Sequence, residues 1–207
     1  MAWRRSGLTI TLILISILVS LAMGFGENRE LMRLLTFTDF SLRGSQVFHH
    51  TFPAMLSTGQ WWRLVTPAFM HFSELHLAFN LLWIWVVGSK IEQMHGRWIL
   101  LGLFLTSATL SNLGQFLVSG PMFGGMSGVV YAVLGYSWLW DKQGYRPRFG
   151  LPQGLMGFML IWLVLGYLGI LQFIGMGAVA NTAHLVGLLV GLLFVLPVRL
   201  LINQSYR

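Results

Sequence analysis

Residues 178–202 read AVANTAHLVGLLVGLLFVLPVRLLI, an apolar stretch whose only charged residue is Arg199. A helix needs about 20 apolar residues to cross the hydrocarbon core of a bilayer, and this stretch is long enough. Five further apolar runs precede it, at 8–23, 71–88, 98–118, 123–140 and 151–174. We therefore predict an all-α polytopic membrane protein with six transmembrane helices.

The overall composition agrees with this prediction. Of the 207 residues, 56% are hydrophobic and 9% are charged, and the mean hydropathy is +0.71. A soluble domain has about 25% charged residues, so a soluble chain of this length could not cover its surface with so few. The net charge of +7 therefore indicates membrane topology rather than nucleic-acid binding. The lack of cysteine excludes disulfides, thiolate nucleophiles and cysteine-bound metals.

The basic residues predict the orientation. In the six-span arrangement, nine of the thirteen Lys and Arg residues lie on one side and four on the other. The larger set is Arg4, Arg5, Lys90, Arg97, Lys142, Arg146, Arg148, Arg199 and Arg207, and the smaller is Arg29, Arg33, Arg43 and Arg63. Because positive charge favours the cytoplasmic side, both termini should be cytoplasmic. We expect a single membrane domain over residues 1–207, with a short cytoplasmic tail at 1–7.

Two segments near the start of the chain have alternative interpretations. The first apolar run could be a secretory signal, but Leu21-Ala22-Met23-Gly24 is a poor cleavage site, so we favour a retained anchor. The long extracytoplasmic loop at 24–68 carries Phe and Trp residues, and such aromatics favour the membrane–water interface. We expect it to lie partly in the outer leaflet as short amphipathic helices. An ordinary extracellular loop fits its composition equally well.

Four polar residues fall inside the predicted spans: His76 and Asn80 in the second, Ser127 at the start of the fourth and His184 in the sixth. His76, Ser127 and His184 each precede the charge that ends their helix by fourteen or fifteen residues. That separation is roughly 21–22 Å at the rise of an α-helix, which places all three about 10 Å below the outer surface. Such residues are functional candidates, although each could instead bond its own helix or a neighbouring one.

Glycines surround two of these residues. Ser127 lies in Gly124-Gly125-Met126-Ser127-Gly128 at a loop-to-helix junction. Glycine there allows close backbone approach, and the free N–H groups of a helix start suit an oxyanion. His184 shares a helix face with Gly187 and Gly191, whose spacing lets another helix pack closely. If the fourth span packs in that groove, His184 reaches Ser127.

A serine beside a histidine base is a nucleophile pair. The six acidic residues lie in loops or near span ends, so we expect a Ser127–His184 dyad rather than a carboxylate-supported triad. Tyr131 lies one turn from Ser127 on the same face and would hold the imidazole in place. His76 and Asn80 would donate hydrogen bonds to the oxyanion.

Four motifs together resemble the rhomboid intramembrane serine proteases, in particular the bacterial GlpG type. They are Trp61-Trp62-Arg63, His71 to Asn80 containing His76-xxx-Asn80, Gly125-Met126-Ser127-Gly128 and Ala183-His184-xx-Gly187-xxx-Gly191, in the order of the family. The resemblance implies a six-helix fold in the cytoplasmic (inner) membrane, with an active site that opens to the outside. It implies a serine endopeptidase that cleaves transmembrane segments near the outer leaflet, without a metal or organic cofactor. The expected partners are transmembrane protein substrates and the lipid bilayer.

The resemblance also implies a role for each residue. Ser127 would be the nucleophile and His184 the general base, with Tyr131 stacked on His184. His76, Asn80 and the backbone N–H of Ser127 would form the oxyanion hole, and the fifth span and loop 120–125 would control substrate access. The structural positions would be Arg63, Glu92, Gly125, Gly128, Gly187 and Gly191. Some GlpG-type proteins have a soluble domain before the first span. Only about seven residues precede it here, so we expect none.

Two other functions could use the same residues. A non-catalytic rhomboid-like protein would bind membrane helices without cutting them, but the presence of both dyad residues argues against it. A transporter could use His76, Asn80 and His184 as a path for protons or for a metal such as zinc or nickel. No carboxylate lies at mid-membrane depth in the six-span arrangement, which argues against this path. A reactive-serine probe separates these classes, because only a protease labels at Ser127.

Overall fold

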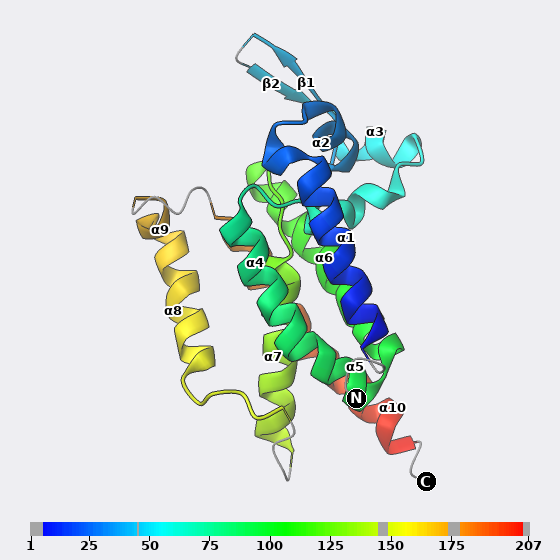
Figure 1. Ribbon diagram of the computed structural model, residues 1–207, viewed down its shortest axis with the longest axis vertical. Helices are drawn as coiled ribbons and strands as arrows, with labels where there is room; N and C mark the ends of the chain where they lie inside the picture. Colours follow the sequence, from blue (N-terminus) through cyan, green and yellow to red (C-terminus); the bar gives the residue numbers. More distant parts are fainter. Residues whose placement is uncertain (1–5, 45, 145–148, 174–178, 205–207) are drawn as a thin grey trace.

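The computed structural model describes residues 6–44, 46–144, 149–173 and 179–204, and the fold is mostly helical (Figure 1). The longer helices are α1 (Gly7–Ala22), α4 (Glu74–Trp83), α6 (Arg97–Ser119), α7 (Ser127–Gln143), α8 (Leu155–Tyr167) and α10 (Asn181–Gln204). A π-helical segment, η5 (Ile84–Gly88), joins α4 to α5 (Ser89–His95), and α9 (Ile170–Phe173) follows α8. Each of the six apolar runs therefore contains a helix.

The helix boundaries differ from the predicted spans in three places. The fourth helix begins at Ser127 rather than at 123. The second run continues through η5 to His95. The fifth run divides at Gly169, whose φ of +73° is a left-handed conformation that ends α8. The predicted end of the fifth span at 174 and the predicted start of the sixth at 178 lie outside the described residues.

Helix α7 lies inside the helical bundle. Its residues from Gly128 to Ser137 are all buried, and α10 packs along it while α6 packs on both (Figure 1). Helix α8 packs on α7 and α10 from another side. The apolar core that joins these helices includes Val133, Leu134 and Tyr136 of α7. Close packing along its whole length fixes the position of α7, and with it the position of its first residue, Ser127.

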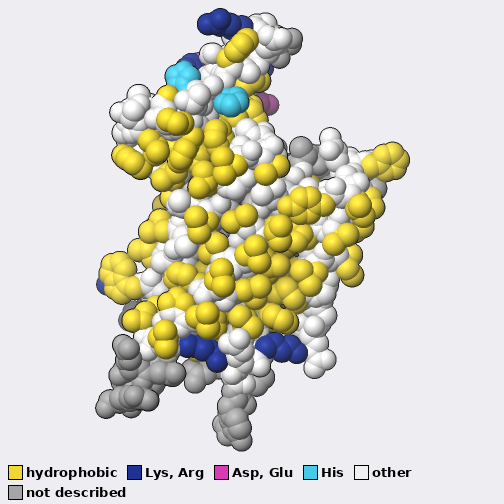
Figure 2. All heavy atoms as spheres, turned by 180° about the vertical axis from the view of Figure 1, so that it is seen from behind, with side chains coloured by type: hydrophobic (Ala, Val, Ile, Leu, Met, Phe, Trp, Pro, Cys, Tyr) yellow, Lys and Arg dark blue, Asp and Glu magenta, His cyan; other side chains and the backbone are white. Residues whose placement is uncertain are grey.

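The outer surface of the bundle is suited to a bilayer. By length and apolar composition, α6 and the part of α10 that ends at Ile202 can each cross a membrane, and α1 and α8 are shorter apolar helices. A broad band of hydrophobic side chains covers the face in Figure 2, with Lys and Arg side chains along its lower edge. An exposed apolar surface of this extent marks a membrane contact, and the chain is an integral membrane protein.

The segment between α1 and α4 lies at one end of the bundle (Figure 1). Its helical elements are η2 (Gly24–Gly26), α2 (Arg29–Leu35), α3 (Phe52–Ser57), η3 (Trp61–Leu64) and η4 (Thr66–Phe69). It also contains an antiparallel hairpin of β1 (Phe40–Arg43) and β2 (Gln46–His49), in which Phe40 pairs with His49. The loop therefore contains short helices and also a hairpin, which the sequence did not indicate. Strands of four residues, of which only Phe40 is buried, are too short for their alternation to indicate a hairpin.

Arg63 holds this loop together. The residue is 2% exposed, and its Nη1 donates to the carbonyl oxygens of Arg33 and Thr36 while its Nε donates to Oε1 of Gln60. A guanidinium has five N–H donors and can bind several acceptors at once. Arg63 therefore ties the end of α2 to η3.

An ion pair stabilises the connection from α2 to the hairpin. Nε of Arg33 donates to Oδ1 of Asp39 at 3.1 Å, and the backbone N–H of Phe40 donates to the same oxygen at 2.7 Å. Burial acts to raise the pKa of Asp39, but the hydrogen bonds from Arg33 and Phe40 and the charges of Arg33 and Arg63 together lower it. The folded loop therefore favours the ionised carboxylate.

Glu92 fixes the start of α1. Its carboxylate accepts from the backbone N–H groups of Leu8 and Thr9, each at 2.8 Å, and from Oγ1 of Thr9 at 2.7 Å. The N–H groups in the first turn of a helix have no acceptor within the helix, and a negative charge is favourable there. Glu92, which is 7% exposed, therefore attaches α5 to the first turn of α1.

Candidate active site

Ser127 and His184 meet between α7 and α10. Nε2 of His184 lies 2.8 Å from Oγ of Ser127, a hydrogen-bond distance. Ser127 is the first residue of α7 and is half-buried, and His184 lies in the first turn of α10 and is 5% exposed. A hydroxyl and an imidazole at this distance can exchange a proton. Two residues separated by 57 positions in the chain are thus brought into direct contact.

Glycines allow this contact. A Cβ atom at Gly187 would overlap the carbonyl oxygen of Gly128, and a Cβ atom at Gly191 would overlap the carbonyl oxygen of Ala132. On the other side of α7, a Cβ atom at Gly128 would lie 2.5 Å from Oγ of Ser111. Helices α7 and α10 therefore touch backbone to backbone beside the Ser127–His184 pair, which is the close approach that small residues permit in membrane bundles.

An aromatic ring supports the imidazole of His184. Tyr131 stacks on it, with ring centroids 4.6 Å apart and an angle of 15° between the ring planes. The hydroxyl of Tyr131 donates to the carbonyl oxygen of Met159 on α8 at 3.0 Å, which fixes the ring in turn. Nδ1 of His184 is buried and has no hydrogen-bond partner among the described residues. Burial and stacking, rather than a carboxylate from the described part of the chain, thus orient the imidazole.

His76 approaches the start of α7 from α4. Ser73 caps α4 and accepts from the backbone N–H of His76 at 3.2 Å. A Cβ atom at Gly125 would lie 2.6 Å from Cε1 of His76, so the imidazole lies against the backbone two residues before Ser127. Gly125 has a φ of +122°, which L side chains rarely adopt. Glycine at 125 therefore satisfies both the backbone conformation and the contact with His76.

Asn80 lies one turn below His76 and is 3% exposed. Its Nδ2 donates to the carbonyl oxygen of His76 at 2.8 Å. An amide nitrogen carries two N–H donors, so the second remains for another acceptor. Within the described residues, the ring nitrogens of His76 make no hydrogen bond, and the N–H of Ser127 begins a helix and has no acceptor in it. Of the two α4 residues, His76 is therefore the one that contacts the loop before α7, whereas the printed bond of Asn80 stays within α4.

His71 also supports the site, although the sequence did not single it out. It is fully buried, and its Nε2 accepts from the backbone N–H of Met126 at 3.3 Å. Its Nδ1 lies 3.2 Å from both Oγ of Ser20 and the carbonyl oxygen of Phe69. The imidazole therefore ties α1 to the residue before Ser127. A histidine at the edge of an apolar run looks like an interface residue, so the sequence indicated no contact between His71 and the start of α7.

Gln115 is a second supporting residue that the sequence did not indicate. It is 6% exposed, and its Oε1 accepts from the backbone N–H of Ala183 at 3.1 Å. This bond fixes the first turn of α10, which carries His184, against α6.

The ring centroids of His71 and His76 lie 5.0 Å apart, but no described group of three or more His, Asp and Glu side chains is arranged to hold a metal ion.

Comparisons with known proteins bear on this arrangement. A family model described as the Rhomboid domain matches residues 58–200, which include all of the candidate site residues. The chain is 39% identical over 194 residues to the rhomboid protease GlpG of Photorhabdus laumondii, covering 93% of this chain and 62% of that protein. It is 48% identical over 134 residues to the rhomboid protease GlpG of Yersinia pestis, covering 65% of this chain and 47% of that protein. The chain thus spans about half to two thirds of the length of these relatives.

Proposed function

The chain belongs to the rhomboid family and is of the GlpG type, and we propose that it is an intramembrane serine endopeptidase. In this proposal it cleaves transmembrane segments of other membrane proteins near the outer leaflet. The observation that carries the proposal is the 2.8 Å contact between Oγ of Ser127 and Nε2 of His184. His184 is buried and stacked on Tyr131, which holds its imidazole in place beside the hydroxyl of Ser127. A base fixed in this way is suited to activate that hydroxyl.

In the first half of the reaction, Oγ of Ser127 attacks the carbonyl carbon of the scissile bond while Nε2 of His184 takes the hydroxyl proton. The tetrahedral intermediate then collapses, the C–N bond breaks and Nε2 returns the proton to the leaving amine. In the second half, His184 takes a proton from water, which attacks the acyl ester. The carboxylic acid leaves, and Ser127 regains its proton.

The negative charge of the intermediate needs donors at the position of the former carbonyl oxygen. We assign this role to His76, Asn80 and the backbone N–H of Ser127. The support is that the imidazole of His76 lies against Gly125 and that Asn80 has a second amide N–H. Donors held in a buried site need little reorganisation when the charge develops, and each contributes a large part of the rate enhancement.

The proposed topology has six spans and places both termini in the cytoplasm of the inner membrane. Figure 1 supports it, because the start of α1, the ends of α5 and α7 and the end of α10 all lie at the lower end of the molecule. The loop between α1 and α4 lies at the opposite end, so it would face the extracytoplasmic side. Ser127, at the upper end of α7, would then open to that side.

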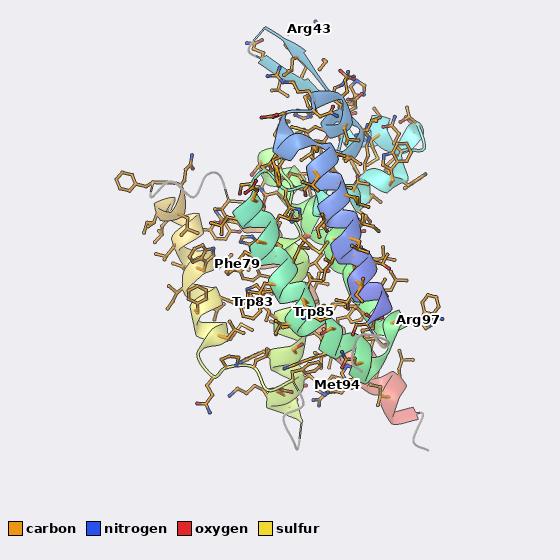
Figure 3. All side chains as sticks on the ribbon, in the orientation of Figure 1. Arg43, Phe79, Trp83, Trp85, Met94 and Arg97 are labelled. Atoms are coloured by element: carbon orange, nitrogen blue, oxygen red, sulfur yellow. The ribbon has the colours of Figure 1, made fainter. Side chains whose placement is uncertain are left out.

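Substrate access would occur at the side of the bundle where α8 lies. Many α8 residues are exposed, including Phe158, Ile161 and Val164, and Figure 3 places Phe79 and Trp83 on the side of α4 nearest α8. A peptide bond in a helix is shielded by its own hydrogen bonds, so the substrate must unwind before Ser127 can attack it. Unwinding costs least in helices that carry Gly or Pro near their outer end, which we propose as the preferred substrates.

The proposal is tested by incubating the purified protein with a set of single-span membrane proteins, beside the Ser127→Ala variant. The expected result is cleavage near the outer end of the span by the unaltered protein and none by Ser127→Ala. Inserted helix-breaking pairs should speed cleavage, and a uniform leucine span should slow it. Binding of the single-span proteins without any cleavage would instead support a non-catalytic rhomboid-like protein.

A further inference from the structure

A groove of about 650 Å³ lies where α1 begins, α5 ends and α6 begins. Its walls come from Leu8 and Thr11 of α1 and from Arg97, Trp98 and Leu101 of α6. This is the end of the bundle that the proposed topology places in the cytoplasmic leaflet, far from Ser127 (Figure 1). From its chemistry, we infer that the groove binds one anionic phospholipid, with the phosphate at Arg97 and an acyl chain along α1 and α6.

Arg97 supplies the positive charge. Its guanidinium lies 5.0 Å from the ring centroid of Trp98 and makes no hydrogen bond or ion pair with any described residue. All five of its N–H donors are therefore available to a ligand. A planar guanidinium binds a phosphate with two parallel hydrogen bonds, which makes arginine well suited to phosphate recognition.

The neighbouring carboxylate forms no ion pair with Arg97 among the described residues. Glu92 also lines the groove, but its two oxygens are occupied by the backbone N–H groups of Leu8 and Thr9 and by the hydroxyl of Thr9. Since the oxygens of Glu92 are directed to the first turn of α1, Arg97 is the charged group that the described part of the groove offers to a ligand. A head group with a net negative charge matches this balance, whereas the ammonium of a zwitterionic lipid would find no partner.

The apolar part of the site continues up the bundle. Leu105 lies one turn above Leu101 on α6, and Ile15 lies one turn above Thr11 on α1, and both are exposed. Helices α1 and α6 contact each other, so these side chains border one track on the surface. Trp98 is 69% exposed at the foot of this track, in the position where tryptophan favours the head-group region. The track therefore suits one acyl chain of a lipid whose phosphate binds Arg97.

The test is native mass spectrometry of purified protein exchanged into equal amounts of dioleoyl phosphatidylglycerol and dioleoyl phosphatidylcholine. All variants carry Ser127→Ala, so the result does not depend on the proposed peptidase activity, and Arg4 and Arg5 stay unchanged. Arg97→Gln should lower the retained phosphatidylglycerol about tenfold, as expected for loss of a charge-assisted contact, and Arg97→Lys should lower it less. Retention of phosphatidylcholine should not change.

Arg43→Gln is the matched control, because Arg43 also lies over an exposed aromatic ring, 5.3 Å from the centroid of Phe48. Figure 3 shows Arg43 at the upper tip of the molecule and Arg97 on the flank of its lower half. This variant should retain phosphatidylglycerol like the parent. An equal loss with Arg43→Gln and Arg97→Gln would show attraction by overall charge and overturn the inference, as would full retention by Arg97→Gln.

Two further experiments test the groove without a change at Arg97. Thr11→Asp places a carboxylate in the groove at an exposed position and should reduce phosphatidylglycerol retention, whereas Thr11→Asn should not. If Arg97→Gln unfolds, this pair of variants still tests whether the groove binds the lipid.

Free glycerol phosphate, added at the same concentration, should not displace the lipid. Displacement would mean that the acyl track contributes nothing and that the site binds small anions only.

Discussion

At the scale of single residues, the imidazole of His184 is oriented by packing, and no carboxylate of the described residues binds it. Tyr131 covers one face of the imidazole, and Nε2 points at Oγ of Ser127. A carboxylate would stabilise the imidazolium that forms during the reaction, and the described residues place none here. We therefore expect a larger share of the rate enhancement to come from stabilisation of the oxyanion.

The proposed oxyanion donors can be tested individually. His76→Ala and Asn80→Ala should each lower the rate of cleavage by roughly 10- to 1,000-fold, because each removes one of several donors. Labelling of Ser127 by a fluorophosphonate should weaken but persist, since the dyad stays intact. Leu82→Ala, at an exposed position on the same helix, is the control and should cleave normally. Full activity in both variants would leave these residues as links between helices only.

At the scale of elements, the site depends on how closely α7 and α10 approach. The carbonyl oxygens of Gly128 and Ala132 occupy the space where side chains at 187 and 191 would begin. Any side chain there must push the helices apart and separate Ser127 from His184.

Gly187→Val should therefore lower both the thermal unfolding temperature and the activity. Gly157→Val is the matched control, because a Cβ atom at Gly157 on α8 would meet nothing within 4 Å. It should leave both properties near those of the parent protein. A Gly187→Val protein that unfolds normally and remains active would show that α7 and α10 do not pack as described.

The loop between α1 and α4 should respond to pH through Asp39. Because the folded state lowers the pKa of Asp39, the ion pair with Arg33 stabilises the protein above the ordinary pKa of an aspartate. That stabilisation is lost as the pH falls through the lowered pKa. Thermal unfolding should therefore show Asp39→Asn to be less stable than the parent at pH 7, with the difference narrowing towards about pH 3. A difference that is constant with pH would contradict this account.

At the scale of the whole molecule, the sequence was sufficient for features that depend on composition and spacing. Each of the six apolar runs contains a helix, and the glycines after His184 indicated a groove into which another helix could pack, which α7 does in the structure. It was insufficient where the structure depends on single long-range bonds. The two described strands, Phe40–Arg43 and Gln46–His49, have one buried residue, and His71 acts through a bond to the backbone of Met126, so neither leaves a pattern in the sequence.

The proposed topology predicts which positions are accessible from each side of the membrane. The sequence contains no cysteine, so single cysteines can be introduced without background labelling. In intact cells, a membrane-impermeant maleimide should label Ser57→Cys, on α3, and should label Gln153→Cys, before α8, only after lysis. Both positions are exposed in the structure. Labelling of Gln153→Cys in intact cells would reverse the orientation.

In the proposed reaction Ser127, activated by His184, is the nucleophile. The most direct measurement is fluorophosphonate labelling of the purified protein, with the modified residue located by peptide mass spectrometry. We expect labelling at Ser127 in the unaltered protein and a loss of labelling of roughly 1,000-fold or more in His184→Ala, because neither member of the pair works alone. Labelling at a different serine, or undiminished labelling of Ser127 in His184→Ala, would contradict it.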